Sequence, residues 1–427
     1  MSHLDIASME GRQVWDSRGR PTIEVEIRLS NGAVGRAIAP AGASTGAGEA
    51  LDLRDGGAAF GGYGVSEAMA GLRNEIIPVL IGLPADQQEL VDGTLEALDG
   101  TPQLSRLGGN ALIATSLAIA HAAAAGRDEP LWSYFAMGDA PLIPVPEIQI
   151  FGGGAHAAGA MDLQDFMVVP FGASSFREAL EWVAEIYLAA GDLVARRGAS
   201  VGVADEGGYW PVFDSNEQAL DALLISIEKA GFDPETQVGM SIDVAANQFF
   251  RDGSYILKAE GRALSTEEWY DQVAGWVRSY PIAMIEDPFT EDDHTSHQKF
   301  TVEFKDRTQI VGDDLLVTNR VNVETAIADG SCTALLCKPN QAGTLTRTKN
   351  AFDAAKAAGM GTIVSARSGE SEDTTIAHLS VGWASGQFKV GSFTRSERMA
   401  KWNEMLRIEE SLGARAKYAG GSVLGRN

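Results

Sequence analysis

Residues able to do chemistry stand at the ends of successive apolar runs: Asp243, Glu286, Asp313 and Lys338. Three carboxylates without histidine or cysteine partners suit a hard, oxygen-binding cation, Mg²⁺ rather than Zn²⁺. An acid at a strand end can also simply cap the following helix, and for one acid alone that interpretation would be preferred. Three acids on different strands, with a lysine on the next, favour a metal site with a base beside it.

The apolar runs that carry these residues predict parallel strands. They occupy 238–243, 281–287, 309–313, 334–338 and 361–365, and from the second onward they end 25 to 27 residues apart. That interval accommodates one strand and one helix, repeated, which is typical of a βα array. In a closed α/β barrel the carboxyl ends of the strands face the same rim. The side chains at these ends are therefore expected to converge on one site.

Lys338 follows the apolar run 335–337, which predicts a position at the mouth of the barrel rather than on the outer surface. A lysine acts as a base only when it is neutral, and we expect Mg²⁺ and nearby cationic groups to lower its pKa. Such a base can take the proton beside a carboxylate if the resulting dianionic enediolate is stabilised, which metal ions do. The residues alone thus indicate metal-assisted proton abstraction.

The chain before this array predicts a smaller first domain. Residues 5–40 contain alternating apolar and polar side chains, as in an antiparallel meander, and residues 64–126 are alanine-rich and helical. Between them, the small-residue stretch 41–49 is either a flexible linker or a mobile lid over a site. The first domain is therefore expected to be α+β.

A Pro-rich connector at 141–146 marks the expected domain boundary. It gives an α+β domain at 1–140, with the mobile loop, and a catalytic α/β barrel at 141–427. Capping patterns at Ser175 and Ser265, each with glutamate three residues later, predict the first residues of two helices of the second domain.

The composition excludes several classes of function. The formal net charge of −24 argues against nucleic-acid binding and means that local cations must hold any anionic substrate. Cys332 and Cys337 lack metal-type spacing and predict buried thiols in a reducing cytoplasm. We find no signal-type start and no apolar run of about 18 residues, so neither export nor membrane insertion is expected. His294 and His297 stand in an acidic segment that we interpret as solvated surface.

The sequence resembles the enolase (phosphopyruvate hydratase) family over nearly its whole length. The resemblance is carried by ordered motifs: Asp16-Ser-Arg-Gly, Gly42-Ala-Ser-Thr-Gly46, Gly153-Gly-Ala-His156, Gln164-Asp-Phe-Met167, Asp205-Glu-Gly-Gly208, Ile285-Glu-Asp-Pro-Phe289, Val311-Gly-Asp-Asp-Leu315, Lys338-Pro-Asn-Gln341 and Arg367-Ser-Gly-Glu370. It implies an eight-stranded α/β barrel, with some antiparallel pairing among its first strands, behind a smaller α+β domain. It also implies a cytoplasmic enzyme, assembled as a homodimer or a multiple of dimers, that removes water from a 2-phosphoglycerate-type acid and gives a phosphoenolpyruvate-type product.

Matched position by position, the resemblance implies a role for each site residue. The expected metal ligands are Asp243, Glu286 and Asp313 for a first Mg²⁺, and Ser44 for a second that arrives with the substrate. The expected catalytic pair is Lys338, which abstracts the C2 proton, and Glu206, the general acid at the C3 hydroxyl. The expected contacts to the small anionic phosphorylated substrate are His156, Asp165 and Gln164, Lys389 at its carboxylate, and Arg367 and Ser368 at its phosphoryl group.

Four departures from the family pattern bear on the substrate. Ala366 stands where enolases have histidine, Asp165 where they have glutamate, Gly48 where many have histidine, and Phe151-Gly152 in place of a usual asparagine context. Because the metal and proton-transfer residues remain, the sequence resembles specialised relatives such as the carboxyphosphonoenolpyruvate synthases of phosphonate antibiotic pathways, with room beside Ala366 for a larger phosphorus group. An ordinary glycolytic enolase is one alternative, and a non-catalytic binding protein on an enolase scaffold is another.

Overall fold

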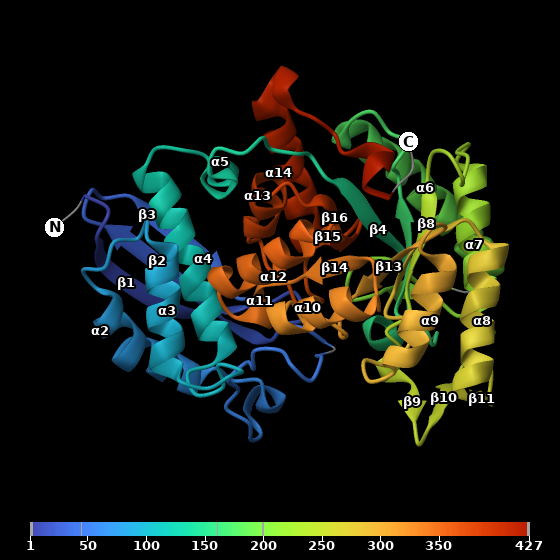
Figure 1. Ribbon diagram of the computed structural model, residues 1–427, viewed down its shortest axis with the longest axis horizontal. Helices are drawn as coiled ribbons and strands as arrows, with labels where there is room; N and C mark the ends of the chain where they lie inside the picture. The colour runs from blue at the N-terminus through green and yellow to red at the C-terminus, as the bar shows by residue number, and fades with distance from the viewer. Residues whose placement is uncertain (1–2, 44, 160, 199, 425–427) are drawn as a thin grey trace.

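The computed structural model describes residues 3–43, 45–159, 161–198 and 200–424 of the chain. A domain of one sheet and several helices comes first, and a closed barrel follows (Figure 1). In Figure 1 the first domain, in blue and teal, lies beside the barrel, whose elements run from green to red. The expected fold, an eight-stranded α/β barrel preceded by a smaller α+β domain, is confirmed.

The first domain opens with the predicted antiparallel meander. Its strands are β1 (Ile6–Trp15), β2 (Pro21–Leu29) and β3 (Val34–Ile38), paired in that order. Every second side chain of β2 is apolar and buried, namely Ile23, Val25, Ile27 and Leu29. These side chains form one dry face of the sheet, as the period of two in the sequence predicts.

Helices follow the sheet, and the longest of them covers it. They are η1 (Ala59–Gly62), α1 (Ser66–Gly71), the π-helix η2 (Leu72–Ile76), α2 (Ile77–Leu80), α3 (Gln88–Asp99), α4 (Gly109–Gly126) and α5 (Leu131–Ala136). Helix α4 packs on β2 and β3 so closely that a Cβ added to Gly35 would lie 2.1 Å from the backbone nitrogen of Ala122. Glycine is therefore required at that contact.

Helix α4 corrects one expectation from the sequence. It has 18 residues and is long and apolar enough to cross a membrane, whereas we expected no such segment. However, 83% of it is buried inside the domain. That burial is typical of a core helix, and the alanine-rich composition suits a helix that must approach a sheet closely.

The barrel has eight strands in a closed ring. They are β4 (Val145–Gly152), β5 (Asp165–Val169), β8 (Gly239–Asp243), β12 (Ile282–Glu286), β13 (Gln309–Gly312), β14 (Ala334–Cys337), β15 (Gly361–Ser365) and β16 (Gly386–Ser392), and β16 pairs with β4 to close the ring. Strand β5 runs antiparallel to β4 and β8, and the other ring pairings are parallel. This matches the expected antiparallel pairing among the first strands.

Helices surround the barrel on its outside (Figure 1). They are α6 (Phe176–Arg197), α7 (Asn216–Lys229), α8 (Thr266–Ser279), α9 (His294–Phe304), α10 (Arg320–Asp329), α11 (Pro339–Ala342), α12 (Leu345–Ala357), α13 (Thr375–Gly382) and α14 (Ser396–Leu412). Both predicted N-caps form, but the predicted capping box at Ser175 is incomplete, because the Glu178 carboxylate accepts the backbone N–H of Ser174 instead. Ser265 and Glu268 make a reciprocal capping box, and Ser175 accepts the backbone N–H of Glu178.

Smaller elements complete the second domain. The hairpin β6 (Ser200–Val203) and β7 (Tyr209–Pro211) extends the sheet beyond β4, and β9 (Phe250–Arg251), β10 (Ser254–Leu257) and β11 (Arg262–Leu264) form a separate small sheet. Short helical turns are η3 (Gly154–Ala157), η4 (Ala246–Gln248), η5 (Gly413–Arg415) and η6 (Gly420–Leu424). The loop between β6 and β7 matters most for the site, because it carries Glu206.

The two histidines at the start of α9 lie in different environments. His294 is exposed, and its Nδ1 lies 3.6 Å from a carboxylate oxygen of Asp329. His297 is fully buried and meets the ring of Phe289 edge to face. The expectation that both are solvated is therefore wrong for His297. It lies on the face of α9 that packs inward together with Phe300 and Phe304.

Candidate active site

The barrel rim brings the predicted strand-end residues together. Asp243 ends β8 and Glu286 ends β12, where the strand register sets them side by side. Lys389, on β16 across the ring, donates to Asp243 Oδ2 over 3.0 Å and to Glu286 Oε2 over 2.7 Å. Asp313 and Lys338 follow the next two strands, and Lys338 Nζ lies 2.5 Å from Asp313 Oδ2. The predicted convergence on one site is confirmed.

Asp243, Asp313, Lys338 and Lys389 line a cavity of about 30 Å³. Its walls contain nearly all predicted catalytic, metal and substrate residues: His156, Gln164, Asp165, Glu206, Asp243, Asp313, Lys338, Arg367, Ser368 and Lys389. Gly42, Ala43, Ser365, Ala366 and Val390 complete the wall. Glu286 lies against Lys389 rather than in the cavity wall, and Ser44 lies outside the described residues.

The negative charges of the buried carboxylates at the rim are only partly balanced by nearby cations and hydrogen-bond donors of the protein. Burial, followed by the charge of Asp243, raises the pKa of Glu286 well above its usual value. Burial also acts to raise the pKa of Asp243, but the ammonium of Lys389, a hydrogen bond with Glu286 and the charge of Lys338 together outweigh it, so that this pKa is lowered. Glu286 Oε1 is buried and has no hydrogen-bond partner among the described residues. An all-oxygen donor set with an orphaned carboxylate oxygen fits a hard divalent cation such as Mg²⁺.

A second acidic group lies next to this one. Among the described residues, Asp287, Asp313 and Asp314 have carboxylate oxygens within 4.8 Å of one another. The three predicted ligands, Asp243, Glu286 and Asp313, do not lie this close together. Asp287, at φ +40°, accepts the backbone N–H of Asp313 over 3.0 Å and of Asp314 over 2.7 Å. Both of its oxygens are therefore engaged in shaping the turn that presents Asp313. In the predicted trio, Lys389 bridges Asp243 and Glu286, whereas Asp313 pairs with Lys338.

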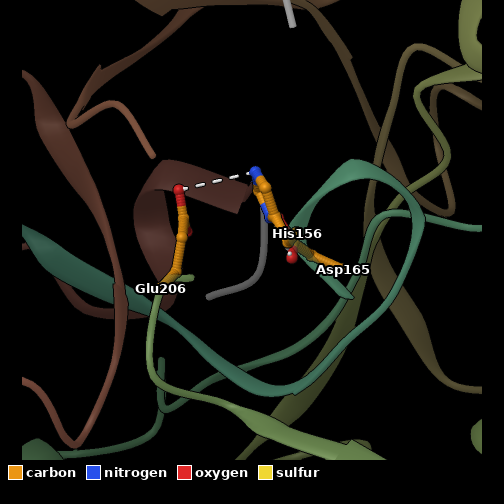
Figure 2. Close-up of side chains that lie close together, drawn as sticks. All are labelled: His156, Asp165 and Glu206. Atoms are coloured by element: carbon orange, nitrogen blue, oxygen red, sulfur yellow. Dashed lines mark hydrogen bonds and ion pairs between the residues drawn. The ribbon is translucent and has the colours of Figure 1, made fainter. Parts of the chain in front are cut away.

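The opposite wall holds a histidine between two acids, shown in Figure 2. His156 Nδ1 lies 2.9 Å from Asp165 Oδ1, and its Nε2 lies 3.8 Å from Glu206 Oε1. Burial alone would lower the pKa of His156, but Asp165 and Glu206 outweigh it and raise that pKa to about 9. The ring is therefore an imidazolium at neutral pH. An imidazolium has no lone pair to offer a metal, so this group is better suited to proton transfer.

Gln149 is a site residue that the sequence analysis missed. Its side-chain amide donates to Asp165 Oδ1, and its carbonyl oxygen accepts the backbone N–H of Gly208 over 2.8 Å. It thus ties the His156 wall to the loop that carries Glu206. A usable signal existed, because Gln149 and Glu147 are the two polar residues of a strand that is otherwise apolar. Buried polar side chains in such strands are usually there to satisfy a partner.

Arg367 forms one side of the cavity, next to Ala366 and Ser368. Its guanidinium donates to Asn340 Oδ1 over 3.0 Å, and its backbone oxygen accepts a hydrogen bond of 2.6 Å from buried Arg398. Arg398 also donates to the backbone oxygen of Ser368 over 2.6 Å. The strand-following loop at 366–368 is therefore held from behind. Ala366 is buried beside it and presents only a methyl group to the cavity.

The charge environment of Lys338 differs from the expectation. Burial lowers its pKa, and Arg367 and Lys389 act in the same direction. The carboxylates of Asp313 and Glu286 together outweigh them, so the pKa is raised above its usual value rather than lowered. The sequence indicated the nearby cations but not the direct ion pair with Asp313.

A closed α/β barrel with carboxylates and lysines at the carboxyl ends of its strands belongs to the large class of barrel proteins that place their active sites at that rim. Comparison with known families narrows the class. Residues 6–135 match the enolase N-terminal domain, and residues 140–426 match the enolase C-terminal TIM barrel domain. The chain belongs to the enolase family. Membership supports a hydro-lyase function of the enolase type and the binding of Mg²⁺, which is general in the family.

Proposed function

We propose that this protein is a Mg²⁺-dependent lyase that removes water from a 2-phosphoglycerate-type acid, and that its own substrate carries a larger group on phosphorus, such as the carboxyphosphono compound of phosphonate antibiotic biosynthesis. The observation that carries the proposal is the presence of Lys338, Glu206 and Arg367 in the walls of one cavity. A base, an acid and a phosphoryl-binding fork are the three groups that such an elimination needs.

The base side comes from β14. Lys338 takes the C2 proton, and Lys389 binds the substrate carboxylate that lies beside the carbanion centre. Asp243, Glu286 and Asp313 would hold Mg²⁺, and the bound ion supplies positive charge where the enediolate charge develops. Arg367 and Lys389 favour the neutral form of Lys338, which the reaction requires, whereas Asp313 opposes it.

The acid side comes from the loop between β6 and β7. Glu206 protonates the departing C3 hydroxide, so that water leaves rather than an anion. His156 Nε2 lies 3.8 Å from Glu206 Oε1 and is held protonated by the charges of Asp165 and of Glu206 itself, so the imidazolium is placed to supply the proton that Glu206 passes on. We assign His156 and Asp165 to orienting this acid and the substrate hydroxyl. Gln164 donates to Asp243 Oδ2 over 2.9 Å and sits where it can also reach the substrate.

The phosphate side supports the larger substrate. Arg367 offers a planar fork that suits phosphoryl oxygens, and Ser368 stands next to it in the wall. Beside them Ala366 supplies no hydrogen-bond donor and fills little of the space. A substrate with an extra carboxyl on phosphorus would use that volume. The second candidate is an ordinary glycolytic enolase acting on 2-phosphoglycerate, which the presence of every described metal and proton-transfer residue favours.

The test compares the catalytic efficiency (kcat/KM) of the parent and Ala366→His on 2-phosphoglycerate and on the carboxyphosphono analogue. A charge-assisted hydrogen bond contributes about 1.5–3 kcal/mol, so the imidazole introduced by Ala366→His should raise kcat/KM on 2-phosphoglycerate by roughly tenfold or more. The same ring should reduce activity on the analogue by filling its space. Ala358→His, at the exposed end of α12, is the matched control. A parent that already prefers 2-phosphoglycerate would contradict the larger substrate and leave the glycolytic assignment.

A further inference from the structure

Glu49 has no part in the chemistry described so far, yet it is buried at the base of the 41–49 stretch and paired with Arg367. Its side chain is 4% exposed. Arg367 Nη1 lies 2.9 Å from Glu49 Oε2, and Arg367 Nη2 lies 3.2 Å from Glu49 Oε1. Two parallel bonds of this kind fix the plane of a guanidinium as well as its position.

The Glu49 carboxylate is itself held by groups from both domains. Its Oε1 accepts the backbone N–H of Gly46 over 2.9 Å and the side-chain amide of Gln341 over 3.3 Å. The same amide nitrogen of Gln341 donates to Asp313 Oδ1 over 2.8 Å. One carboxylate therefore connects the first domain, the phosphate-side arginine and, through one amide, a candidate metal ligand.

The pairing matters because an arginine side chain has many rotamers and Arg367 is buried. A buried guanidinium without a counter-ion is strongly unfavourable, and a flexible one loses the geometry that a planar fork offers to phosphorus-bound oxygens. Burial acts to lower the pKa of Arg367, but the carboxylates around it, Glu49 foremost and then Asp313, together outweigh burial and raise that pKa. The carboxylate of Glu49 is the charged partner that makes a fixed, buried guanidinium tolerable here.

We propose that Glu49 is a positioning residue, which acts through Arg367 by fixing the guanidinium in the orientation that the phosphorus-bearing group of the substrate requires. The proposal rests on the proposed function, because that assignment gives Arg367 its phosphoryl group. Glu49 adds no attraction for an anion, since its own charge is negative. Its effect is therefore on orientation, and orientation appears in kcat more than in the affinity for phosphate.

The test uses the full-length Glu49→Gln variant, which keeps the shape of the side chain and removes its charge. Arginine side-chain NMR of the ligand-free protein, with the Arg367 signal assigned from Arg367→Lys, should show faster guanidinium rotation than in the parent. The kcat on the better of the two substrates should fall tenfold or more. Titration calorimetry with inorganic phosphate in the presence of Mg²⁺ should show a dissociation constant that rises less than threefold or decreases, because a repulsive charge has gone.

Glu24→Gln is the matched control. Glu24 is also a buried glutamate of the first domain that pairs with an arginine. Its Oε1 lies 2.5 Å from Nη1 of Arg12, and neither residue lines the cavity. This variant should leave kcat and the Arg367 signal unchanged. Thermal unfolding of both variants measures any loss of stability, which a purely structural role of Glu49 would also cause. A fall in kcat without a matching loss of phosphate affinity is expected only from the positioning role.

A double-mutant cycle shows whether Glu49 acts through Arg367. In the Arg367→Ala background the additional Glu49→Gln change should alter kcat less than twofold. Unchanged Arg367 dynamics in Glu49→Gln, an unchanged kcat, or the same loss in both backgrounds would overturn the proposal. If Arg367→Ala left phosphate binding intact, the assignment of Arg367 to the phosphoryl group in the proposed function would fail instead. The NMR measurement would still show whether Glu49 restrains the Arg367 guanidinium.

Discussion

Lys338 places its ammonium nitrogen 2.5 Å from Oδ2 of Asp313, across the neighbouring strands β14 and β13. The candidate base and a candidate metal ligand therefore form an ion pair. Both groups are buried, so neither charge is well screened by solvent. The pair joins the two parts of the proposed chemistry, because a cation that engages Asp313 competes with Lys338 for the same carboxylate.

The first prediction concerns the metal ligands. Asp313→Asn and Glu286→Gln should each weaken Mg²⁺ binding at least tenfold, because one lost oxygen anion leaves the dehydration of the ion poorly compensated. Titration calorimetry measures this directly. Asp292→Asn, at an exposed acid of the loop after β12, is the control.

The same titrations discriminate between the two acidic groups of the rim. If Mg²⁺ binds between Asp287, Asp313 and Asp314, Asp314→Asn will weaken binding and Glu286→Gln will not. That pattern would contradict the proposed ligand set. We expect the reverse, since Asp287 already uses both oxygens on backbone N–H groups.

The second prediction concerns the charge of His156. Its pKa is raised to about 9, although burial acts to lower it, because Asp165 and Glu206 lie beside the ring. Imidazole NMR should show His156 protonated at pH 7.5, and Asp165→Asn should lower its pKa by at least about one unit. A neutral His156 at pH 7.5 would contradict the assignment.

The raised pKa of His156 also predicts how stability depends on pH. A histidine whose pKa is above the unfolded value of 6.5 stabilises the folded state fully below about pH 6.5, and this contribution is lost as the pH rises through about 9. Denaturant unfolding of the parent and of His156→Gln should therefore give free energies of unfolding that approach each other between pH 6.5 and about 9. A difference that grew with pH would have the wrong sign.

The third prediction concerns His297, which is buried away from the site. Burial lowers its pKa to about 4. Stability that depends on its neutral form is present above pH 6.5 and is lost as the pH falls through about 4, by roughly 3 kcal/mol in total. His297→Leu should remove this acid sensitivity, and His294→Leu, at the exposed position, should not. Acid unfolding curves followed by circular dichroism measure the difference, and equal curves for parent and His297→Leu would contradict it.

Much of the barrel could be predicted because several of its buried strands give apolar runs that end in a polar residue at the rim. Strands buried on both faces give apolar runs, and the first polar residue after each run, as with Asp313 and Lys338, marks the rim. The helix starts at Ser175 and Ser265 were predictable for the same reason, since capping chemistry is local. Local rules therefore predicted the four strand-end residues of the site, whereas its other residues were predicted from the resemblance to enolases.

The rest depends on contacts between residues far apart in the chain. Glu49 and Arg367 are 318 residues apart, and nothing near either residue predicts that they form a pair. The raised pKa of Lys338 follows from the distance to Asp313 rather than from residue types. His297 was misjudged because its acidic neighbours suggested solvent, whereas the inward face of α9 determines its burial.

The most direct test of the central claim is exchange of the C2 proton of 2-phosphoglycerate with D2O, followed by NMR in the presence of Mg²⁺. This measurement isolates proton abstraction from the later loss of water. The parent should exchange the proton, and Lys338→Ala should show no detectable exchange while retaining its circular dichroism spectrum and Mg²⁺ affinity. Lys349→Ala, on the outer helix α12, should behave like the parent. Exchange by Lys338→Ala at the parental rate would contradict the assignment of Lys338 as the base.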